Sequence, residues 1–115
     1  MSGRPLALIV EDAADQVALL RRYLDREGLD VFVAVDAESA IAAFDDIDPV
    51  VAVIDLHLPG ITGRECARRV QERFPDCFLV ISSVLDATDY PSADAALPKP
   101  FTGAHVHAII EQVRR

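Results

Sequence analysis

The sequence predicts an α/β domain, a doubly wound five-stranded parallel sheet with helices on both faces. Short apolar runs alternate with longer amphipathic segments along the chain, which is the pattern of repeated βα units. Several apolar runs are continuous, as expected of strands that are covered on both faces. The chain has 115 residues, enough for one hydrophobic core and too few for two, so residues 1–115 are expected to form a single domain.

Five runs are expected to be strands. Three of them, at 6–10, 50–54 and 77–81, are apolar throughout, which fits strands buried under helices. A fourth run at 31–35 is rich in valine, and the weak run at 95–98 ends in a proline, which an edge strand tolerates. Their sequences, in chain order, are LALIV, VFVAV, VVAVI, CFLVI and AALP.

Four helices are expected, because apolar residues recur at helical spacing after the first, second, third and last of these strands. The first helix, over 14–27, ends at Gly28, the second is capped by Asp36, and Pro75 closes the third. The last ends in two arginines, which suit a helix C-terminus. The apolar residues that define the four faces are Val17, Leu20, Leu24, Ala40, Ile41, Phe44, Cys66, Ala67, Val70, Phe74, Val106, Ile109, Ile110 and Val113.

Composition narrows the class of protein. Apolar residues make up 51% and charged residues 26% of the chain, as in ordinary soluble domains. The net charge of −8 argues against direct nucleic-acid binding, which needs a basic surface. No apolar run is long enough for a membrane span or a signal peptide. Cys66 and Cys77 lack metal-site spacing and are expected to be buried thiols. We therefore expect a cytoplasmic protein in a reducing compartment.

Polar residues follow the predicted strands, at the edge where doubly wound sheets bind their ligands. Glu11 and Asp12 follow the first strand and Asp55 the third, while Ser82 follows the fourth and Lys99 the fifth. Three carboxylates, a hydroxyl and an ammonium group should therefore gather at one edge of the sheet.

This combination of groups predicts a phosphoryl-accepting site. Three neighbouring carboxylates repel one another, so a raised pKa or a bound cation is expected, and a ligand set made only of oxygen suits Mg²⁺. A lysine and a hydroxyl beside the ion supply a positive charge and a donor for a phosphoryl group. A carboxylate can act as the nucleophile and give an aspartyl phosphate.

Five segments match a known pattern: VED at 10–12, DLHLPG at 55–60, Gly63, ISS at 81–83 and KPF at 99–101. Each is a weak signal alone, but they occur in the right order and after the right strands. Together they show that the chain resembles, over essentially its whole length, the receiver (CheY-like) domain of bacterial two-component response regulators. The resemblance implies a flavodoxin-like sheet with strand order 2-1-3-4-5.

The resemblance also implies a role for each residue at the strand ends. Asp55 would accept the phosphoryl group. Mg²⁺ would be bound by Asp12 directly, by Glu11 through water, by Asp55 and by the backbone carbonyl of His57. The domain would catalyse its own phosphorylation and dephosphorylation without being a conventional enzyme.

Two further residues would contact the phosphoryl group itself. By resemblance, Ser82 would bind a phosphoryl oxygen when the domain switches, and Lys99 would pair with the phosphate. The Lys99–Pro100 bond would be cis and would aim the lysine at Asp55. The donor would be a histidine kinase or a histidine phosphotransfer protein, and the output would be a contact with a downstream protein that the sequence does not identify.

Simpler interpretations exist for several of these residues. Glu11 and Asp12 also suit an ordinary helix N-terminus, and Asp55 also suits the start of a turn. A hydroxyl such as that of Ser82 often satisfies loop backbone, and Ser83 is small enough to leave the site open.

The three histidines are expected to do no direct chemistry. The side chain of His57 should lie at the rim of the site, facing solvent or an approaching partner, while its backbone contributes to the site. His105 and His107 are two positions apart on the last helix, so they do not share a face. Both are expected to be surface residues.

Two features depart from the family pattern. The segment between Ser82 and Lys99 is short by roughly a helical turn or more, so the fourth helix of the family is expected to be shortened or missing. Ala96 stands where the family usually has Tyr or Phe, an aromatic side chain that moves inward on activation. Tyr90 is a possible substitute. We expect retained phosphorylation chemistry with an atypical output face, and an order–disorder change over 83–95.

Two other functions are alternatives to the receiver. A degenerate receiver would act as a phosphorylation-independent protein-interaction module, which Ala96 and the short segment favour. A small phosphatase with an aspartyl phosphate would need a second aspartate two positions after the nucleophile. His57 occupies that position, so the phosphatase is disfavoured.

Overall fold

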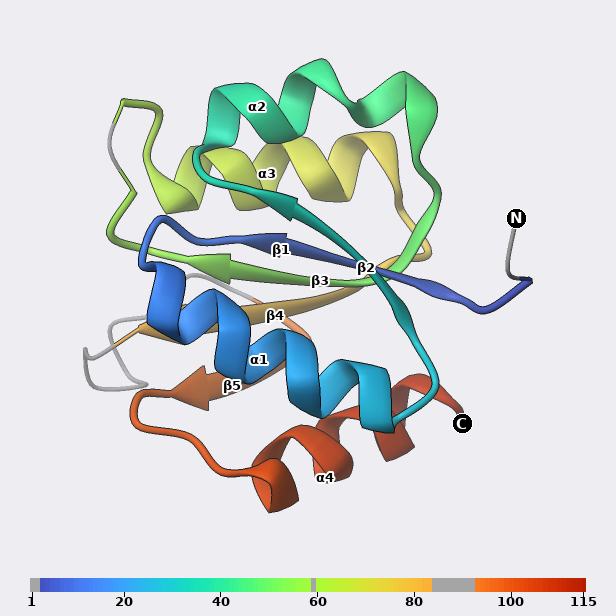
Figure 1. The fold of residues 1–115 in the computed structure, drawn as a ribbon. Helices are drawn as coiled ribbons and strands as arrows, with labels where there is room; N and C mark the ends of the chain where they lie inside the picture. The colour runs from blue at the N-terminus through green and yellow to red at the C-terminus, as the bar shows by residue number, and fades with distance from the viewer. Residues whose placement is uncertain (1–2, 59, 84–92) are drawn as a thin grey trace.

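The five strands form one parallel sheet in the order β2-β1-β3-β4-β5 (Figure 1). The computed structural model describes residues 3–58, 60–83 and 93–115. This confirms the predicted fold class and strand order, and each strand lies within two residues of its predicted bounds. The strands are β1 Leu6–Val10, β2 Asp30–Ala34, β3 Pro49–Asp55, β4 Phe78–Ser83 and β5 Ala95–Pro98.

The helices follow the predicted pattern with one change in the second. There the α-helix ends early, because the backbone changes to the i→i+3 hydrogen bonds of a 3₁₀-helix. These bonds run from Ala43 N to Ala40 O (3.1 Å) and from Asp46 N to Ala43 O (2.9 Å). Phe44 therefore packs from a 3₁₀ turn and not from the α-helix. The helices are α1 Ala14–Arg26, α2 Ala37–Ala42, α3 Gly63–Arg73 and α4 Gly103–Val113, and the 3₁₀ turn η1 is Phe44–Asp46.

Four α-helices occur in the part of the chain that the structure describes. The predicted change in the family's fourth helix concerns residues 83–95, of which 84–92, including Tyr90, lie outside the described residues. None of the four helices in the described ranges is long and apolar enough to cross a membrane.

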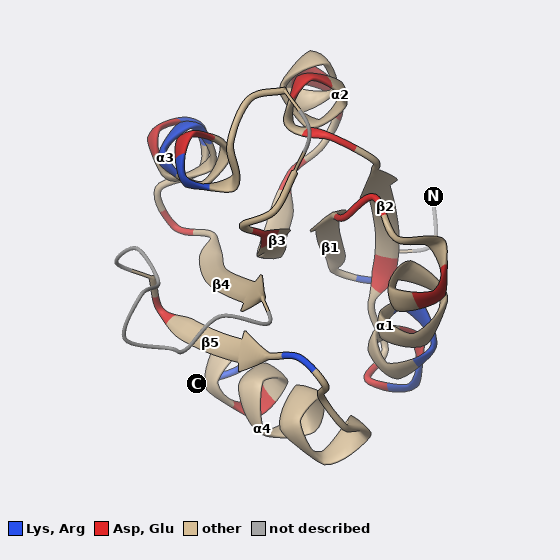
Figure 2. Ribbon diagram, turned by 90° about the vertical axis from the view of Figure 1, so that its left-hand side faces the viewer, with Lys and Arg blue, Asp and Glu red and all other residues tan. Residues whose placement is uncertain are grey.

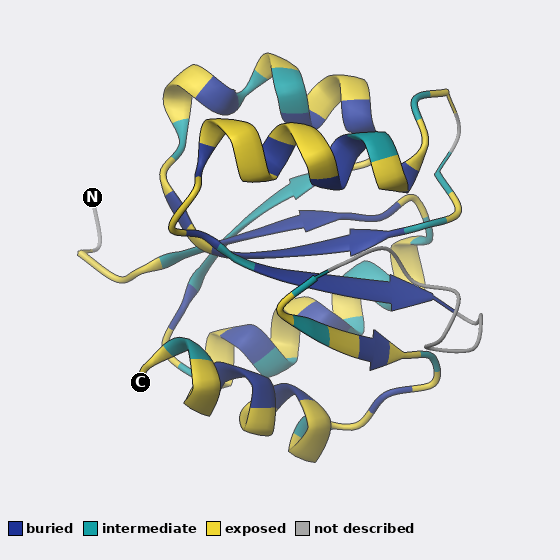
Figure 3. Cartoon of the chain, turned by 180° about the vertical axis from the view of Figure 1, so that it is seen from behind, coloured by how far each residue is buried: buried dark blue, intermediate teal, exposed yellow. Residues whose placement is uncertain are grey.

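Two hydrophobic cores hold the helices on the sheet, one on each face. Helices α1 and α4 cover one face and α2 and α3 the other (Figures 1 and 3). Residues of β3 alternate between them: Val51 and Val53 pack on the α1/α4 side, whereas Ala52 and Ile54 pack on the α2/α3 side. By this period of two, the next residue, Asp55, points to the α1/α4 side.

Both cysteines are buried and free, as predicted. Cys66 lies on α3 and Cys77 directly precedes β4. Burial raises the pKa of each thiol to about 12, and a nearby carboxylate charge, Glu38 at Cys66 and Asp94 at Cys77, adds to the effect.

We expect neither thiol to react with Ellman's reagent in the native protein at pH 8. With a pKa near 12, only about one thiol in 10⁴ is ionised at that pH, and the thiolate is the reactive form. In denaturant both thiols should react within minutes. The single variants Cys66→Ser and Cys77→Ser assign each signal, and rapid labelling of the native wild type would contradict the prediction.

The two histidines of α4 are exposed, as predicted, and each has a structural role. His105 closes a capping box with Thr102: its N–H donates to Thr102 Oγ1 at 3.3 Å, and its Nδ1 accepts from Thr102 N at 3.4 Å. His107 Nδ1 lies 2.9 Å from Glu27 Oε1 at the end of α1. The latter contact joins α1 to α4, an interaction that the sequence did not indicate.

Candidate functional site

The predicted site residues meet at the carboxyl ends of the strands. Figure 2 views this edge of the sheet: acidic segments follow β1 and end β3, and a basic segment follows β5. Asp55 and Ser82 are paired neighbours in the β3–β4 register. Glu11 and Lys99 directly follow β1 and β5. The site is therefore assembled by the parallel topology from four separate segments.

The buried part of the site lies over the α1/α4 core. A small cavity of ≈ 10 Å³ separates the site from that core. The volume is about the minimum that a single water molecule needs. Its walls mix core and site side chains: Ile9, Val10, Glu11, Gln16, Leu20, Val53, Asp55, Ser82 and Phe101.

Three carboxylates converge in the site. One oxygen from each of Glu11, Asp12 and Asp55 lies within 4.8 Å of the others. Glu11 and Asp55 are each only 5% exposed, whereas Asp12 is exposed.

Backbone N–H groups fix the two buried carboxylates. Glu11 Oε2 accepts from Asp12 N at 3.1 Å and from Ala13 N at 3.3 Å, and Asp55 Oδ1 accepts from His57 N at 3.0 Å. Burying two carboxylates is costly unless they are compensated.

Lys99 supplies part of that compensation. Its Nζ contacts Glu11 Oε1 and lies 3.5 Å from Asp55 Oδ2. The side chain is only 13% exposed, and its backbone N–H donates to Ser83 O at 2.8 Å. The Lys99–Pro100 peptide bond is cis, as the resemblance implied.

The cluster has more acidic than basic groups, and this excess affects the pKa values of Glu11 and Lys99. Burial raises the pKa of Glu11; the hydrogen bond from Lys99 opposes this, and Asp55 adds to the rise. Burial acts to lower the pKa of Lys99, but Glu11 and Asp55 outweigh it, so that pKa is raised. One ammonium group thus faces three acids.

These groups fit a hard divalent cation. The convergent donors are carboxylate oxygens, which Mg²⁺ prefers, and the negative charge of three acids exceeds what Lys99 neutralises. The imidazole of His57 is exposed and its backbone N–H is bonded to Asp55, so its side chain lies at the rim as expected. Ligation by the His57 carbonyl stays a prediction.

Ser82 is buried, and its hydroxyl donates to Leu97 O at 2.8 Å. The group therefore satisfies a carbonyl of β5 in this state, and it has to leave that bond to reach a phosphoryl oxygen. Ser83, the next residue of β4, is fully buried. The predicted phosphate contact through Ser82 stays a prediction.

Gly63 has a steric reason to be glycine. A Cβ at this position would lie 2.2 Å from Asp55 O and 2.6 Å from Leu56 Cα. The start of α3 therefore packs directly on the backbone of the predicted acceptor residue.

Replacing Gly63 by alanine is expected to destabilise the fold by about 1–3 kcal/mol, because backbone has to move to admit the methyl group. Urea denaturation measures this. Gly103→Ala is the matched control, since Gly103 also opens a helix but a Cβ there would meet only the Tyr23 side chain, at 3.1 Å. Equal stability of the two variants would contradict the steric argument.

A second cluster of possible metal ligands and a larger pocket are further candidates for a functional site, but neither contains the predicted site residues. Glu27, His107 and Glu111 offer three possible ligand atoms within 4.8 Å, but Arg114 lies 3.4 Å from Glu27 and 3.8 Å from Glu111. The cluster is therefore an ion-pair network between helices.

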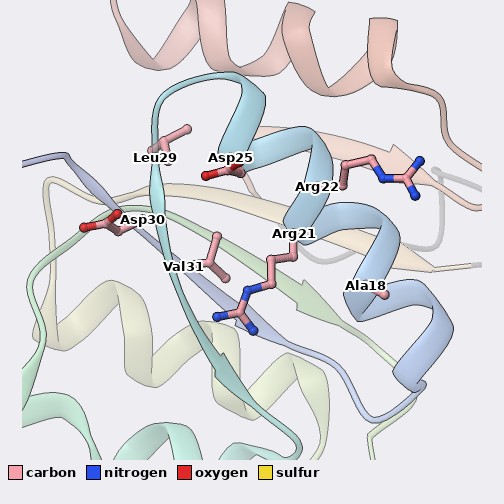
Figure 4. A pocket seen from close by; sticks show the side chains of 7 residues that line it. All are labelled: Ala18, Arg21, Arg22, Asp25, Leu29, Asp30 and Val31. Atoms are coloured by element: carbon pink, nitrogen blue, oxygen red, sulfur yellow. The ribbon is translucent and has the colours of Figure 1, made fainter. Parts of the chain in front are cut away.

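A larger pocket, of ≈ 680 Å³, lies between α1 and β2 (Figure 4). Its two acids, Asp25 and Asp30, lie 3.3 and 3.8 Å from the Arg4 guanidinium, and none of the predicted site residues lines it. Its lining is Ala18, Arg21, Arg22, Asp25, Leu29, Asp30 and Val31.

Comparison with known proteins decides the family. The family model of the response regulator receiver domain matches residues 7–111. The chain belongs to this family. As a receiver domain it is 41% identical to the transcriptional regulatory protein TrcR of Mycobacterium tuberculosis over 107 residues, covering 87% of this chain and 42% of that protein.

Other relatives agree. This receiver domain is 30% identical to the alkaline phosphatase synthesis transcriptional regulatory protein PhoP of Bacillus subtilis, over 94% of this chain and 48% of that protein. The chain thus spans less than half the length of these two relatives.

Solved structures show the same fold at low identity. The chemotaxis response regulator CheY4 of Vibrio cholerae matches with a TM-score of 0.86 at 19% identity, covering 96% of this receiver domain and 98% of that chain. The response regulator TrrA of Thermotoga maritima, solved in complex with Mg²⁺-BeF, matches with a TM-score of 0.85 at 23% identity over 95% and 98% of the two chains.

Proposed function

We propose that this receiver domain accepts a phosphoryl group on Asp55 from a phosphohistidine donor in a Mg²⁺-dependent reaction. The supporting observation is that Lys99 Nζ lies 3.5 Å from Asp55 Oδ2 inside a cluster of three acids. A carboxylate oxygen of Asp55 forms the new P–O bond while the P–N bond of the donor breaks and the imidazole leaves. The donor is a histidine kinase or a histidine phosphotransfer protein.

Each residue has a defined part in this proposal. Glu11, Asp12, Asp55 and the His57 carbonyl would hold Mg²⁺, which supplies neutralisation of charge on the phosphoryl oxygens. The relative TrrA was solved with Mg²⁺-BeF, which supports this assignment.

Two residues change partners when phosphate is present. Lys99 exchanges its carboxylate contacts for a phosphoryl oxygen, and the Ser82 hydroxyl turns from Leu97 O toward the same group. Both side chains already lie beside Asp55, Lys99 through its 3.5 Å contact and Ser82 as its partner in the β3–β4 register.

The domain would signal through a downstream protein and not act as a conventional enzyme. Receiver domains of response regulators are generally not conventional enzymes. The two regulators named above are transcriptional regulatory proteins, and others include a methylesterase and a cyclic di-GMP phosphodiesterase. Those activities belong to longer proteins. For this domain the net charge of −8 favours protein partners over direct nucleic-acid or membrane binding, in the cytoplasm.

The test is incubation with Mg²⁺ and acetyl or carbamoyl phosphate, followed by intact mass spectrometry. We expect an adduct of one phosphoryl group that is absent in Asp55→Ala and in EDTA. The absence of an adduct together with no measurable Mg²⁺ affinity would support the degenerate receiver instead. Ala96 is the observation that favours that alternative, since it lacks the aromatic side chain of the family pattern.

Introducing the missing aromatic is expected to be tolerated. Ala96 is exposed on the edge strand β5, opposite Ile81 in the register, so Ala96→Tyr should change the free energy of unfolding by no more than about 0.5 kcal/mol. Thermal denaturation measures it. Alanine at Ile81, which is fully buried, is the contrasting control. A large loss of stability in Ala96→Tyr would contradict the exposure of this position.

A further inference from the structure

We propose that Glu38 is a positioning residue for this site: its carboxylate holds the segment after β3 and thereby sets where His57 presents its backbone carbonyl. The inference rests on the proposed function, in which that carbonyl binds Mg²⁺. Glu38 itself touches none of the reacting groups.

The contact is direct and specific to the backbone. Glu38 Oε1 accepts a hydrogen bond from Ile61 N at 3.0 Å. Gly60 has a φ of +72°, and a Cβ on it would lie 2.5 Å from Glu38 Oε2 and 3.1 Å from Oε1. The carboxylate thus lies against two consecutive residues, Gly60 and Ile61, and the absence of a side chain on Gly60 leaves room for it.

The position of Glu38 is set by α2. The Asp36 side chain caps this helix by accepting from Ser39 N at 2.7 Å. Ala37 and Ala40 are buried against the sheet, so Glu38, between them, projects outward from the helix. Its charge also reaches α3, because Glu38 is the second cause, after burial, of the raised pKa of Cys66.

The segment is held at two ends, with His57 in between. The segment leaves β3 at Asp55, and its far end is fixed in two places: Gly63 packs back on Asp55 O, and Glu38 accepts a hydrogen bond from Ile61 N. The N–H of His57 donates to Asp55 Oδ1 at 3.0 Å. In this proposal, a displacement of Ile61 moves the peptide groups of the same segment that lie beside the Asp55 carboxylate.

The fold does not depend on this tether. Leu56, Leu58 and Ile61 are partly buried against the α2/α3 core and keep the segment on the domain, whereas the exposed Glu38 contributes a hydrogen bond to its backbone. Loss of the carboxylate should therefore alter the geometry of the site without unfolding it.

The experiment compares Glu38→Ala with Glu38→Gln, which keeps the acceptor oxygen without the charge. Mg²⁺ affinity is measured by calorimetry. Formation of the phosphoryl adduct from acetyl phosphate is measured by intact mass spectrometry at limiting and at saturating Mg²⁺. We expect Glu38→Ala to weaken Mg²⁺ binding about three- to tenfold, the effect of one hydrogen bond, with adduct formation restored at saturating Mg²⁺. Glu38→Gln should remain within about twofold of wild type.

A second measurement reads the tether itself. Hydrogen exchange of the Ile61 amide should accelerate in Glu38→Ala and not in Asp45→Ala. Asp45 is the matched control because its side chain is 96% exposed and its only ion pair in the described part of the chain is a 3.6 Å contact with Arg73.

Each outcome decides the inference. Wild-type Mg²⁺ affinity in Glu38→Ala would overturn it, and so would equal losses in the alanine and glutamine variants, which would indicate a charge effect and not positioning. A wild-type domain that binds no Mg²⁺ and forms no adduct would overturn the proposed function first, before any variant is compared.

Discussion

Replacing Lys99 by alanine is expected to destabilise the metal-free domain by about 2–3 kcal/mol at pH 8. Removing one partner of a buried ion pair leaves the other charge uncompensated, at a cost of about 3–5 kcal/mol in fully buried cases. Lys99 retains 13% exposure, which places the expected loss at or below the lower end of that range. Urea denaturation in EDTA measures it.

The pH dependence of this loss follows from the direction of two pKa shifts. The pKa of Lys99 is raised above 10.5, so the wild type keeps this stabilisation at neutral pH and loses it only as pH rises through the raised value. The pKa of Glu11 is raised above 4.5, so its ionised form costs stability above that raised value and the cost disappears as pH falls. The Lys99→Ala deficit should therefore shrink as pH falls from 8 through the raised pKa of Glu11.

An exposed cation provides the control for Lys99. Arg68 contacts Glu65 and Glu72 on the surface of α3, where ion pairs contribute about 0–1 kcal/mol. Arg68→Ala should therefore cost no more than this. A Lys99→Ala protein as stable as wild type at pH 8 would show that the buried carboxylates do not need the ammonium group.

Asparagine at Asp55 is expected to have the opposite effect on stability while abolishing the phosphoryl adduct. The substitution removes one of the like charges that raise the pKa of Glu11, and the amide oxygen can still accept from His57 N. Lys99 then pairs with Glu11 alone. We expect the metal-free domain to gain about 0.5–2 kcal/mol, the usual size of a stabilising substitution.

Thermal denaturation in EDTA measures the gain, and intact mass measures the loss of the adduct. Asp12→Asn serves as the control, since Asp12 is exposed and its charge should cost less. A destabilised Asp55→Asn protein would contradict the assignment of repulsion to this pair. A variant that is more stable but inactive would indicate a trade-off between stability and activity, in which the site's charges destabilise the fold but are needed for the reaction.

The parallel topology made most of this site predictable. Once a strand is recognised, the residue after its carboxyl end is known to lie at one edge of the sheet, and this located Asp55 and Lys99 near each other before any contact was measured. The period of two within a strand then fixed the face. Contacts in which one side chain reaches across to a loop follow no sequence period, so they could not be predicted in this way.

Glu38 and His107 are examples of what the sequence did not reveal. Each makes a single polar contact between segments that no strand register relates, to Ile61 N and to Glu27. The bond from the Ser82 hydroxyl to Leu97 O was also not predicted, because a hydroxyl at a strand end has several backbone acceptors within reach. The early end of α2 depended on local hydrogen-bond geometry near Pro49.

The small cavity beneath the site leaves little room for water on the core side of Asp55. A space of ≈ 10 Å³ under Asp55 and Ser82 holds no more than about one water molecule, and apart from Glu11 and Gln16 its remaining walls are core side chains. With so little room for water beneath the site, bulk water that hydrolyses an aspartyl phosphate would come from the solvent side of the site, as the phosphoryl donor would. The lifetime of a phosphorylated state would then depend more on the residues at the solvent side, where the exposed His57 lies, than on the core below the site.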